Sequence, residues 1–95
     1  LKKLKAERAL FTEDLSAVPG LLVIPSQADY LMVGVTNGVK VSDLRQYLFE
    51  KNNILIKDLS SKIPDGRQFM RLAIRNREEN AYFTAALKKA LQALL

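Results

Sequence analysis

The segment from Ile54 to Asn80 constrains the fold more than any other part of this chain of 95 residues. Its order predicts a short apolar strand, a polar loop, a second strand with spaced arginines, and the capped start of a helix. From Phe69 to Arg75 the residue types alternate, so one face of the second strand is apolar. An apolar strand face packs on a helix or a core. The opposite face would present Arg71 and Arg75 about 13 Å apart.

A helix start follows this strand directly. Asn76 and Glu79 stand at the spacing of a capping box, and Asn is a favourable N-cap residue in its own right. Apolar side chains then recur at steps of three and four: Tyr82, Phe83, Ala86, Leu87, Ala90, Leu91 and Leu94. This periodicity predicts an amphipathic final helix that packs against the sheet.

The rest of the chain supplies two further helices and three further strands. The expected segments are a helix from Leu1 to about Ala17, strands Leu21 to Ile24 and Tyr30 to Thr36, a helix capped by Ser42 and ended by Asn52-Asn53, a strand from Ile54 to Lys57, and a loop from Leu59 to Gln68. This order predicts an α+β domain: a small, mainly antiparallel sheet of three to four strands with helices packed on one face.

Composition excludes several classes of chemistry. The chain contains no Cys and no His, which removes disulfides, thiolate nucleophiles, imidazole metal ligands and the usual general base. No segment has the length of a membrane span, and no signal-peptide pattern precedes the first helix. We therefore expect a cytoplasmic protein without a metal site or membrane contact, with a disulfide-free secreted domain as the alternative. Because the chain begins with Leu inside a helical pattern, we also expect it to be part of a longer protein.

The net charge of +5 raises the possibility of an RNA-binding module or a module for an acidic partner. Phe69, Tyr82 and Phe83 could stack on bases. Tyr82 and Phe83, however, belong to the apolar stripe of the final helix, and the order of elements does not match an RNA-recognition motif. A free-standing binding module is therefore the alternative from another functional class, and the leading expectation is no nucleic-acid partner.

Three segments together resemble a known family. Arg71 on a strand, followed by Glu79-Asn80 at a helix start, resembles the late pattern of pyridoxal-phosphate enzymes of the aspartate aminotransferase fold type. The segment from Gly20 to Leu31 is similar to their strand–Pro-Ser–bend–strand element, and Ile54 to Asp58 is similar to the strand before their variable loop. The nearest branch is that of the histidinol-phosphate aminotransferases and the threonine-phosphate decarboxylases.

The resemblance implies that the chain is the C-terminal small domain of a two-domain enzyme. The large domain, outside this chain, would hold pyridoxal phosphate as a Schiff base with its own lysine. The small domain would position the carboxylate of an amino acid or amino-acid phosphate and, by moving as a lid, help to exclude water. Transamination and decarboxylation both stay open. Members of the family are typically homodimers through the large domain.

The resemblance also implies site residues. It assigns Arg71 to the substrate's α-carboxylate, which the planar guanidinium can hold with two parallel hydrogen bonds. The alternative is a structural ion pair with Asp29 or Asp58. Arg75 could bind a second anionic group such as a phosphate, or it could be an ordinary surface arginine. Lys57 stands where the family often carries an arginine near the distal end of the substrate, and it keeps the charge without the bidentate geometry.

No catalytic or cofactor-binding residue is expected in this chain. Ser60-Ser61-Lys62 imitates the Ser-x-Lys of the cofactor lysine. In the family that lysine is followed by an aromatic residue and glycines, whereas Ile63-Pro64-Asp65 follows here. We therefore expect Lys62 to be an ordinary loop lysine.

Overall fold

The computed structural model of the chain describes residues 2–24 and 29–95. Within these residues the elements are α1 (Lys2–Ser16), β1 (Leu21–Ile24), β2 (Tyr30–Val35), α2 (Val41–Asn52), β3 (Lys57–Asp58), the short 3₁₀ helix η1 (Ser60–Lys62), β4 (Gln68–Ala73) and α3 (Arg77–Ala93). The expected α+β class is confirmed. The Pro25-Ser26 bend, which carried part of the resemblance, lies outside the described residues.

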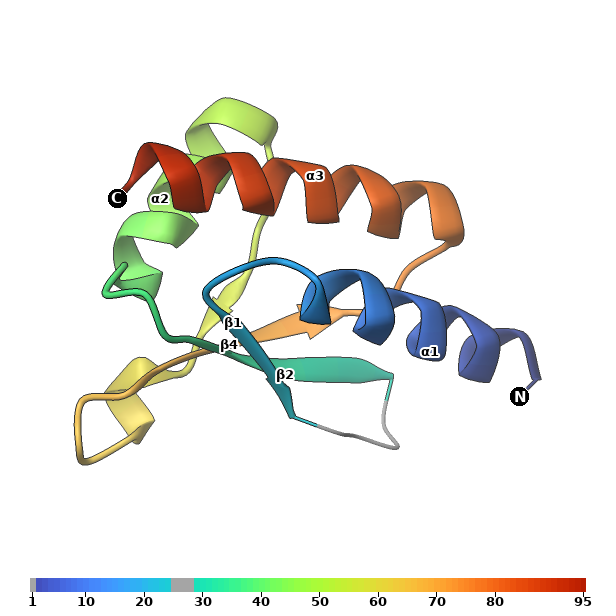
Figure 1. Cartoon of the computed structure of the whole chain (residues 1–95), viewed down its shortest axis with the longest axis horizontal. Coiled ribbons are helices and arrows are strands. Elements are labelled where there is room, and N and C mark those ends of the chain that lie inside the picture. The colour runs from blue at the N-terminus through green and yellow to red at the C-terminus, as the bar shows by residue number, and fades with distance from the viewer. Residues whose placement is uncertain (1, 25–28) are drawn as a thin grey trace.

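The strands form one sheet in the order β1-β2-β4-β3, and each neighbouring pair is antiparallel. β4 is therefore an inner strand, with β2 on one side and β3 on the other. Figure 1 shows α1 and α3 lying on the same side of the sheet, with α2 beside α3. The opposite face of the sheet carries no α-helix in the described part of the chain.

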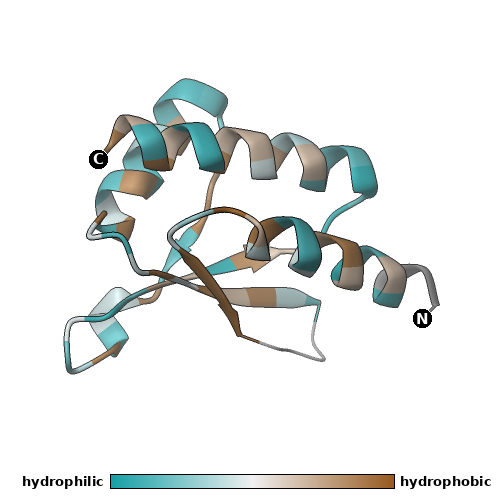
Figure 2. Ribbon diagram, viewed as in Figure 1, coloured by the Kyte–Doolittle hydropathy of each residue, from teal (hydrophilic) through white to brown (hydrophobic). Residues whose placement is uncertain are grey.

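Alternation along the strands separates a buried face from an open one. On the helix-covered face, Leu31 lies opposite Leu72 and Val33 opposite Met70, and all four side chains are at most 3% exposed. They pack with side chains from all three helices: Phe11, Leu15, Leu44, Leu48, Leu87 and Leu91. In Figure 2 most of β1 is hydrophobic, whereas α3 begins in hydrophilic residues. The core thus lies between the sheet and the helices.

β4 ends at Ala73, so the strand is shorter than the predicted one, although burial still alternates through buried Ile74 to exposed Arg75. The Ile74 N–H still donates to the Asp29 carbonyl, at 3.1 Å, beside β2. At Arg75, both backbone groups bind the Asn80 side chain instead: the N–H donates to Oδ1 at 2.9 Å, and the carbonyl accepts from Nδ2 at 3.0 Å. The amide of the buried Asn80 therefore turns the chain out of the sheet.

β3 is also shorter than the expected strand from Ile54 to Lys57. The Ile54 N–H donates to the Leu48 carbonyl at the end of α2, and Ile56 is buried in the core. These contacts hold residues 54–56 away from β4, and only Lys57 and Asp58 pair with it.

The predicted helix ends are confirmed in two cases and wrong in one. Glu79 N–H donates to Asn76 Oδ1 at 2.8 Å, which confirms Asn76 as the N-cap of α3. The return bond, from Asn76 Nδ2 to Glu79 Oε1 at 2.7 Å, joins the two side chains, whereas in a capping box the donor is the backbone N–H of the N-cap residue. Asn53 ends α2 in the left-handed conformation, with φ 54°. Ser42 does not cap α2, because the helix already begins at Val41. The Val41 N–H instead donates to Oε1 of Gln68 on β4, at 2.8 Å.

Candidate functional site

Arg71 lies in the middle of the open sheet face. Its direct cross-strand neighbours are Met32 on β2 and Lys57 on β3, so the three side chains share this face. Directly opposed residues of antiparallel strands have Cα atoms about 4.5–5.5 Å apart. Both cationic side chains are exposed. The structure thus brings together two of the three predicted site residues, Arg71 and Lys57.

The guanidinium of Arg71 lies over an aromatic ring. Its Cζ is 5.2 Å from the centroid of the Tyr30 ring, within the range of a cation–π contact. Tyr30, on β2, lies directly opposite Ala73 of β4. Tyr30 is therefore the diagonal cross-strand neighbour of Arg71. The guanidinium is therefore directed toward β2, away from Lys57 on β3.

The structural ion pair considered for Arg71 is absent from residues 2–24 and 29–95, where Arg71 pairs with no carboxylate. Asp29 is exposed, and Asp58 accepts the Ser60 N–H at 2.8 Å. Two like charges directly opposite each other across a strand pair disfavour the fold unless water or an anion compensates them. Arg71 and Lys57 therefore form a candidate anion site.

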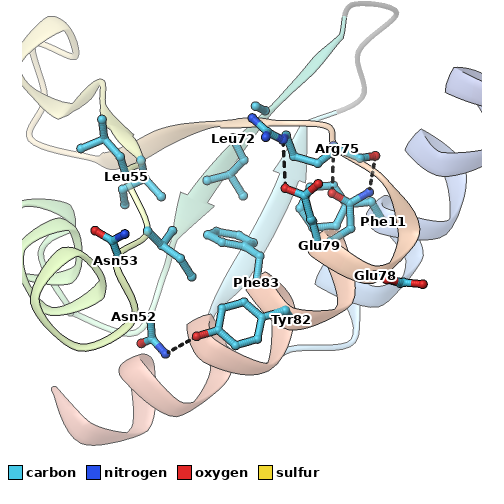
Figure 3. A pocket seen from close by; sticks show the side chains of 14 residues that line it. Phe11, Asn52, Asn53, Leu55, Leu72, Arg75, Glu78, Glu79, Tyr82 and Phe83 are labelled. Carbon is cyan, nitrogen blue, oxygen red and sulfur yellow. Dashed lines mark hydrogen bonds and ion pairs between the residues drawn. The ribbon is translucent and has the colours of Figure 1, made fainter.

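Arg75 lies in a different environment from Arg71. It is outside β4, and its Nε forms an ion pair with Glu79 Oε2 at 3.2 Å. It lines a cavity of about 450 Å³ between the end of α2, residues 53–56 and the start of α3. In Figure 3, Arg75 and Glu79 lie on one side of this cavity, and the hydrogen-bonded pair Asn52–Tyr82 lies on another. Arg75 and Arg71 therefore do not form one paired site on the strand face.

Arg67 provides a contrast on the same side of the sheet. Its Cζ lies 5.5 Å from the ring centroid of Phe69, but its Nε also binds Asp65 Oδ2 at 2.8 Å. The hydrogen bond from the Arg67 side chain holds the pKa of the Asp65 carboxyl below its ordinary value. Arg67 is thus already paired within its own loop.

Tyr30 and the cavity were not identified from the sequence. Tyr30 contacts Arg71 only because β2 pairs with β4 in one particular register, and spacing along the chain does not fix that register. The cavity exists because residues 54–56 diverge from β4, a consequence of tertiary contacts. Its apolar side is formed by Phe11, Ile54, Leu72 and Phe83.

None of the lysines whose burial the structure describes lies in a buried pocket. A lysine that forms a Schiff base is activated by desolvation in a hydrophobic pocket or by a neighbouring cationic group. The side chains of lysines 5, 40, 51, 57, 62, 88 and 89 are all exposed. Lys62 ends the short helix η1 within the predicted loop. No group of three or more acidic side chains that could hold a metal ion occurs in the described ranges.

None of the helices described is long and apolar enough to cross a membrane. No family model matches the chain. It is 32% identical over 87 residues to CMP-5'-(3-aminopropyl)phosphonate synthase of Streptomyces rubellomurinus, covering 90% of this chain and 14% of that protein. It is 36% identical over 88 residues to histidinol-phosphate aminotransferase 1 of Burkholderia lata, covering 93% of this chain and 24% of that protein.

The chain is also similar to solved structures of such enzymes. A decarboxylase from Sulfurospirillum multivorans has a TM-score of 0.88 and 30% identity, over 95% of this chain and 25% of that one. The chain thus spans about a quarter or less of the curated relatives named above. Together, the relatives and structures match it to the C-terminal region of fold-type I pyridoxal-phosphate-dependent aminotransferases and related decarboxylases, as the sequence resemblance predicted.

Proposed function

We propose that this chain is the small C-terminal domain of a pyridoxal-phosphate-dependent aminotransferase and binds the carboxylate of the substrate. The observation that carries the proposal is Arg71, an exposed guanidinium at the centre of the open sheet face with no carboxylate partner among the described residues. A guanidinium donates two parallel hydrogen bonds to a carboxylate, so it fixes the orientation of an amino acid as well as attracting it.

Lys57 extends the proposal to substrates with a second anionic group. Its cross-strand position beside Arg71 places a second positive charge on the same face. An ammonium on a flexible stem attracts a phosphate as a point charge, without selecting its orientation. We therefore include amino-acid phosphates in the substrate class. Arg75 has a weaker claim to this role, because Glu79 already occupies its Nε.

In this proposal the remaining parts of the enzyme lie outside the chain. A large domain of the same protein would hold pyridoxal phosphate, which supplies the electron sink for the bonds at the substrate's α-carbon. The small domain would hold the substrate's carboxylate and, on closing, exclude water from the reaction. The proposal includes a cytoplasmic homodimer, joined through the large domain. A decarboxylase of the same family is the alternative reaction.

RNA binding is less well supported by the arrangement of the aromatic rings. A stacking platform needs an uncovered ring face. Arg71 lies over the ring of Tyr30, and Arg67 lies over the ring of Phe69, which is only 8% exposed. Tyr82 is 57% exposed, so its predicted place in the apolar stripe is wrong. It lies, however, on α3 rather than on the sheet face, and its hydroxyl accepts a hydrogen bond from Asn52. We therefore propose a carboxylate substrate as the partner of this face, with no nucleic-acid or membrane partner.

The test is Arg71→Lys in the intact enzyme, assayed with an amino-acid substrate and with an amine that lacks the carboxylate. Loss of one charge-assisted bond and of the fixed orientation should cost about 2–3 kcal/mol, or roughly thirty- to more than a hundredfold in kcat/KM. The amine substrate should be nearly unaffected.

Arg67→Lys is the matched control, because it makes the same change on the same side of the sheet at an arginine that Asp65 already holds. Arg67→Lys should leave kcat/KM unchanged with both substrates. Equal losses with both substrates in Arg71→Lys would mean that Arg71 supports the sheet, and the assignment of the carboxylate site would be wrong.

A further inference from the structure

Arg71 has a long, flexible side chain on an exposed strand face, yet its guanidinium takes up a defined position over Tyr30. A flexible side chain loses rotamer entropy when it binds a ligand in one orientation. A side chain already held near that orientation loses less. Contacts that hold Arg71 before a carboxylate binds would therefore favour binding.

Three features of the open face direct Arg71 toward β2. Tyr30 offers a ring face diagonally across the β2–β4 pair, at 5.2 Å. The next residue on this face of β4 is Ala73, directly opposite Tyr30, and its small side chain leaves room for the guanidinium to lean along the strand. Lys57 approaches from the opposite side, on β3, and repels it. The ring attracts and the ammonium repels, and both effects displace the guanidinium in the same direction.

We propose that Tyr30 is a positioning residue for Arg71: its ring holds the guanidinium over β2 with the N–H groups free to receive a substrate carboxylate. This inference rests on the proposed function, because it assumes that Arg71 binds the carboxylate. A guanidinium that stacks on a ring still has N–H donors at its edge, so positioning and carboxylate binding are compatible. The hydroxyl of Tyr30 has no part in this role.

Tyr30→Leu and Tyr30→Phe in the intact enzyme separate the ring from the hydroxyl. Tyr30→Leu should lower kcat/KM for carboxylate substrates by about three- to thirtyfold, the range of a cation–π contact between exposed and desolvated sites. The loss should appear mainly as a higher KM. Tyr30→Phe keeps the ring face and should stay within about twofold of the parent enzyme. Amine substrates should respond to neither change.

A double-mutant cycle identifies the residue through which Tyr30 acts. In an Arg71→Lys background, Tyr30→Leu should cost much less than in the parent, because the guanidinium that the ring positions is gone. Tyr82→Leu is the matched control: Tyr82 is an exposed tyrosine on α3 that contacts Asn52 and lies away from Arg71. It should leave kcat/KM unchanged with both kinds of substrate.

The outcomes separate this inference from the function on which it rests. Equal losses from Tyr30→Leu in both backgrounds, or with the amine substrate, would overturn it, and so would a loss in Tyr30→Phe as large as that in Tyr30→Leu. If Arg71→Lys itself spares carboxylate substrates, it is the proposed function that fails.

A measurement on this chain needs no variant that might misfold. The δ-methylene protons of Arg71 should show an upfield ring-current shift in the NMR spectrum, because the side chain lies over the Tyr30 ring. Shifts typical of a free arginine would also overturn the proposal.

Discussion

The two faces of the sheet differ in the side chains that the same strands present: one face is apolar and buried, and the other carries exposed charged residues. On the helix-covered face, Met70 and Leu72 are almost completely buried against side chains of the helices. On the open face, Arg71 stands between these two residues in the sequence and is exposed. The covered face supplies the hydrophobic free energy of folding, and the open face can carry charge because folding does not require it to be buried.

On the open face, two arginines contact aromatic rings, and no α-helix in the described ranges covers them. Phe69 lies against Gly34, where a Cβ atom would come within 3.0 Å of the ring. The rings of Phe69 and Tyr30 each lie beneath an arginine. Such contacts favour binding, because a side chain that a ring already positions loses less rotamer entropy when a ligand arrives.

The largest difference should be between substitutions at two neighbouring residues of β4, Met70 and Arg71. Met70→Ala removes a fully buried side chain and should lower the free energy of unfolding by about 2–5 kcal/mol. Arg71→Ala, on the opposite face, should change it by less than about 0.5 kcal/mol. Urea denaturation of both variants measures this contrast. Similar losses in the two would show that the open face also stabilises the fold.

The second contrast is between two ion pairs of α3. Arg77 binds Glu7 of α1 at 3.0 Å, and the Glu7 side chain is only 11% exposed. Arg77→Ala leaves this carboxylate without its partner and should lower the free energy of unfolding by about 1–3 kcal/mol. Arg75→Ala breaks an exposed pair and should cost about 0.5 kcal/mol or less. Adding Glu7→Gln to Arg77→Ala should restore part of the lost free energy of unfolding, because it removes the unpaired carboxylate. No recovery would mean that the unpaired charge of Glu7 is not the cause of the loss.

A smaller effect is expected from overpacking the open face. Gly34→Ala should displace the Phe69 ring and destabilise the protein by about 1 kcal/mol, at the low end for overpacking, because α1, α2 and α3 all lie on the other face of the sheet. Thermal unfolding and the chemical shifts of the Phe69 ring test this. A loss of several kcal/mol would mean that the ring is as tightly enclosed as the core.

The smallest effect concerns pH. Since Arg67 lowers the pKa of Asp65, the fold favours the ionised carboxylate. Its contribution to stability is present above the ordinary pKa of an aspartate and is lost as the pH falls through the lowered value. Arg67→Ala should return the NMR titration of Asp65 to its ordinary midpoint, with no resolvable change in melting temperature. An unchanged midpoint would refute the contact.

The sequence alone predicted the features that depend on local periodicity. Alternation in β4 located the buried Met70 and the exposed Arg71, and the spacing of Asn76 and Glu79 located the start of α3. Features fixed by long-range contacts could not be predicted in this way. Gln68 caps α2 from 27 residues away, and the Asn80 amide ends the extended segment at Arg75. The contact between Tyr30 and Arg71 requires the register of two strands, which spacing does not determine.

The account depends most on what Arg71 binds, and a crystal structure of the intact enzyme with a bound amino-acid substrate would show it directly. We predict that both carboxylate oxygens lie about 2.7–2.9 Å from two nitrogens of the Arg71 guanidinium, the spacing of a charge-assisted bidentate pair. The guanidinium should still lie over the Tyr30 ring. A substrate carboxylate held by other residues, with Arg71 directed into solvent, would contradict the account.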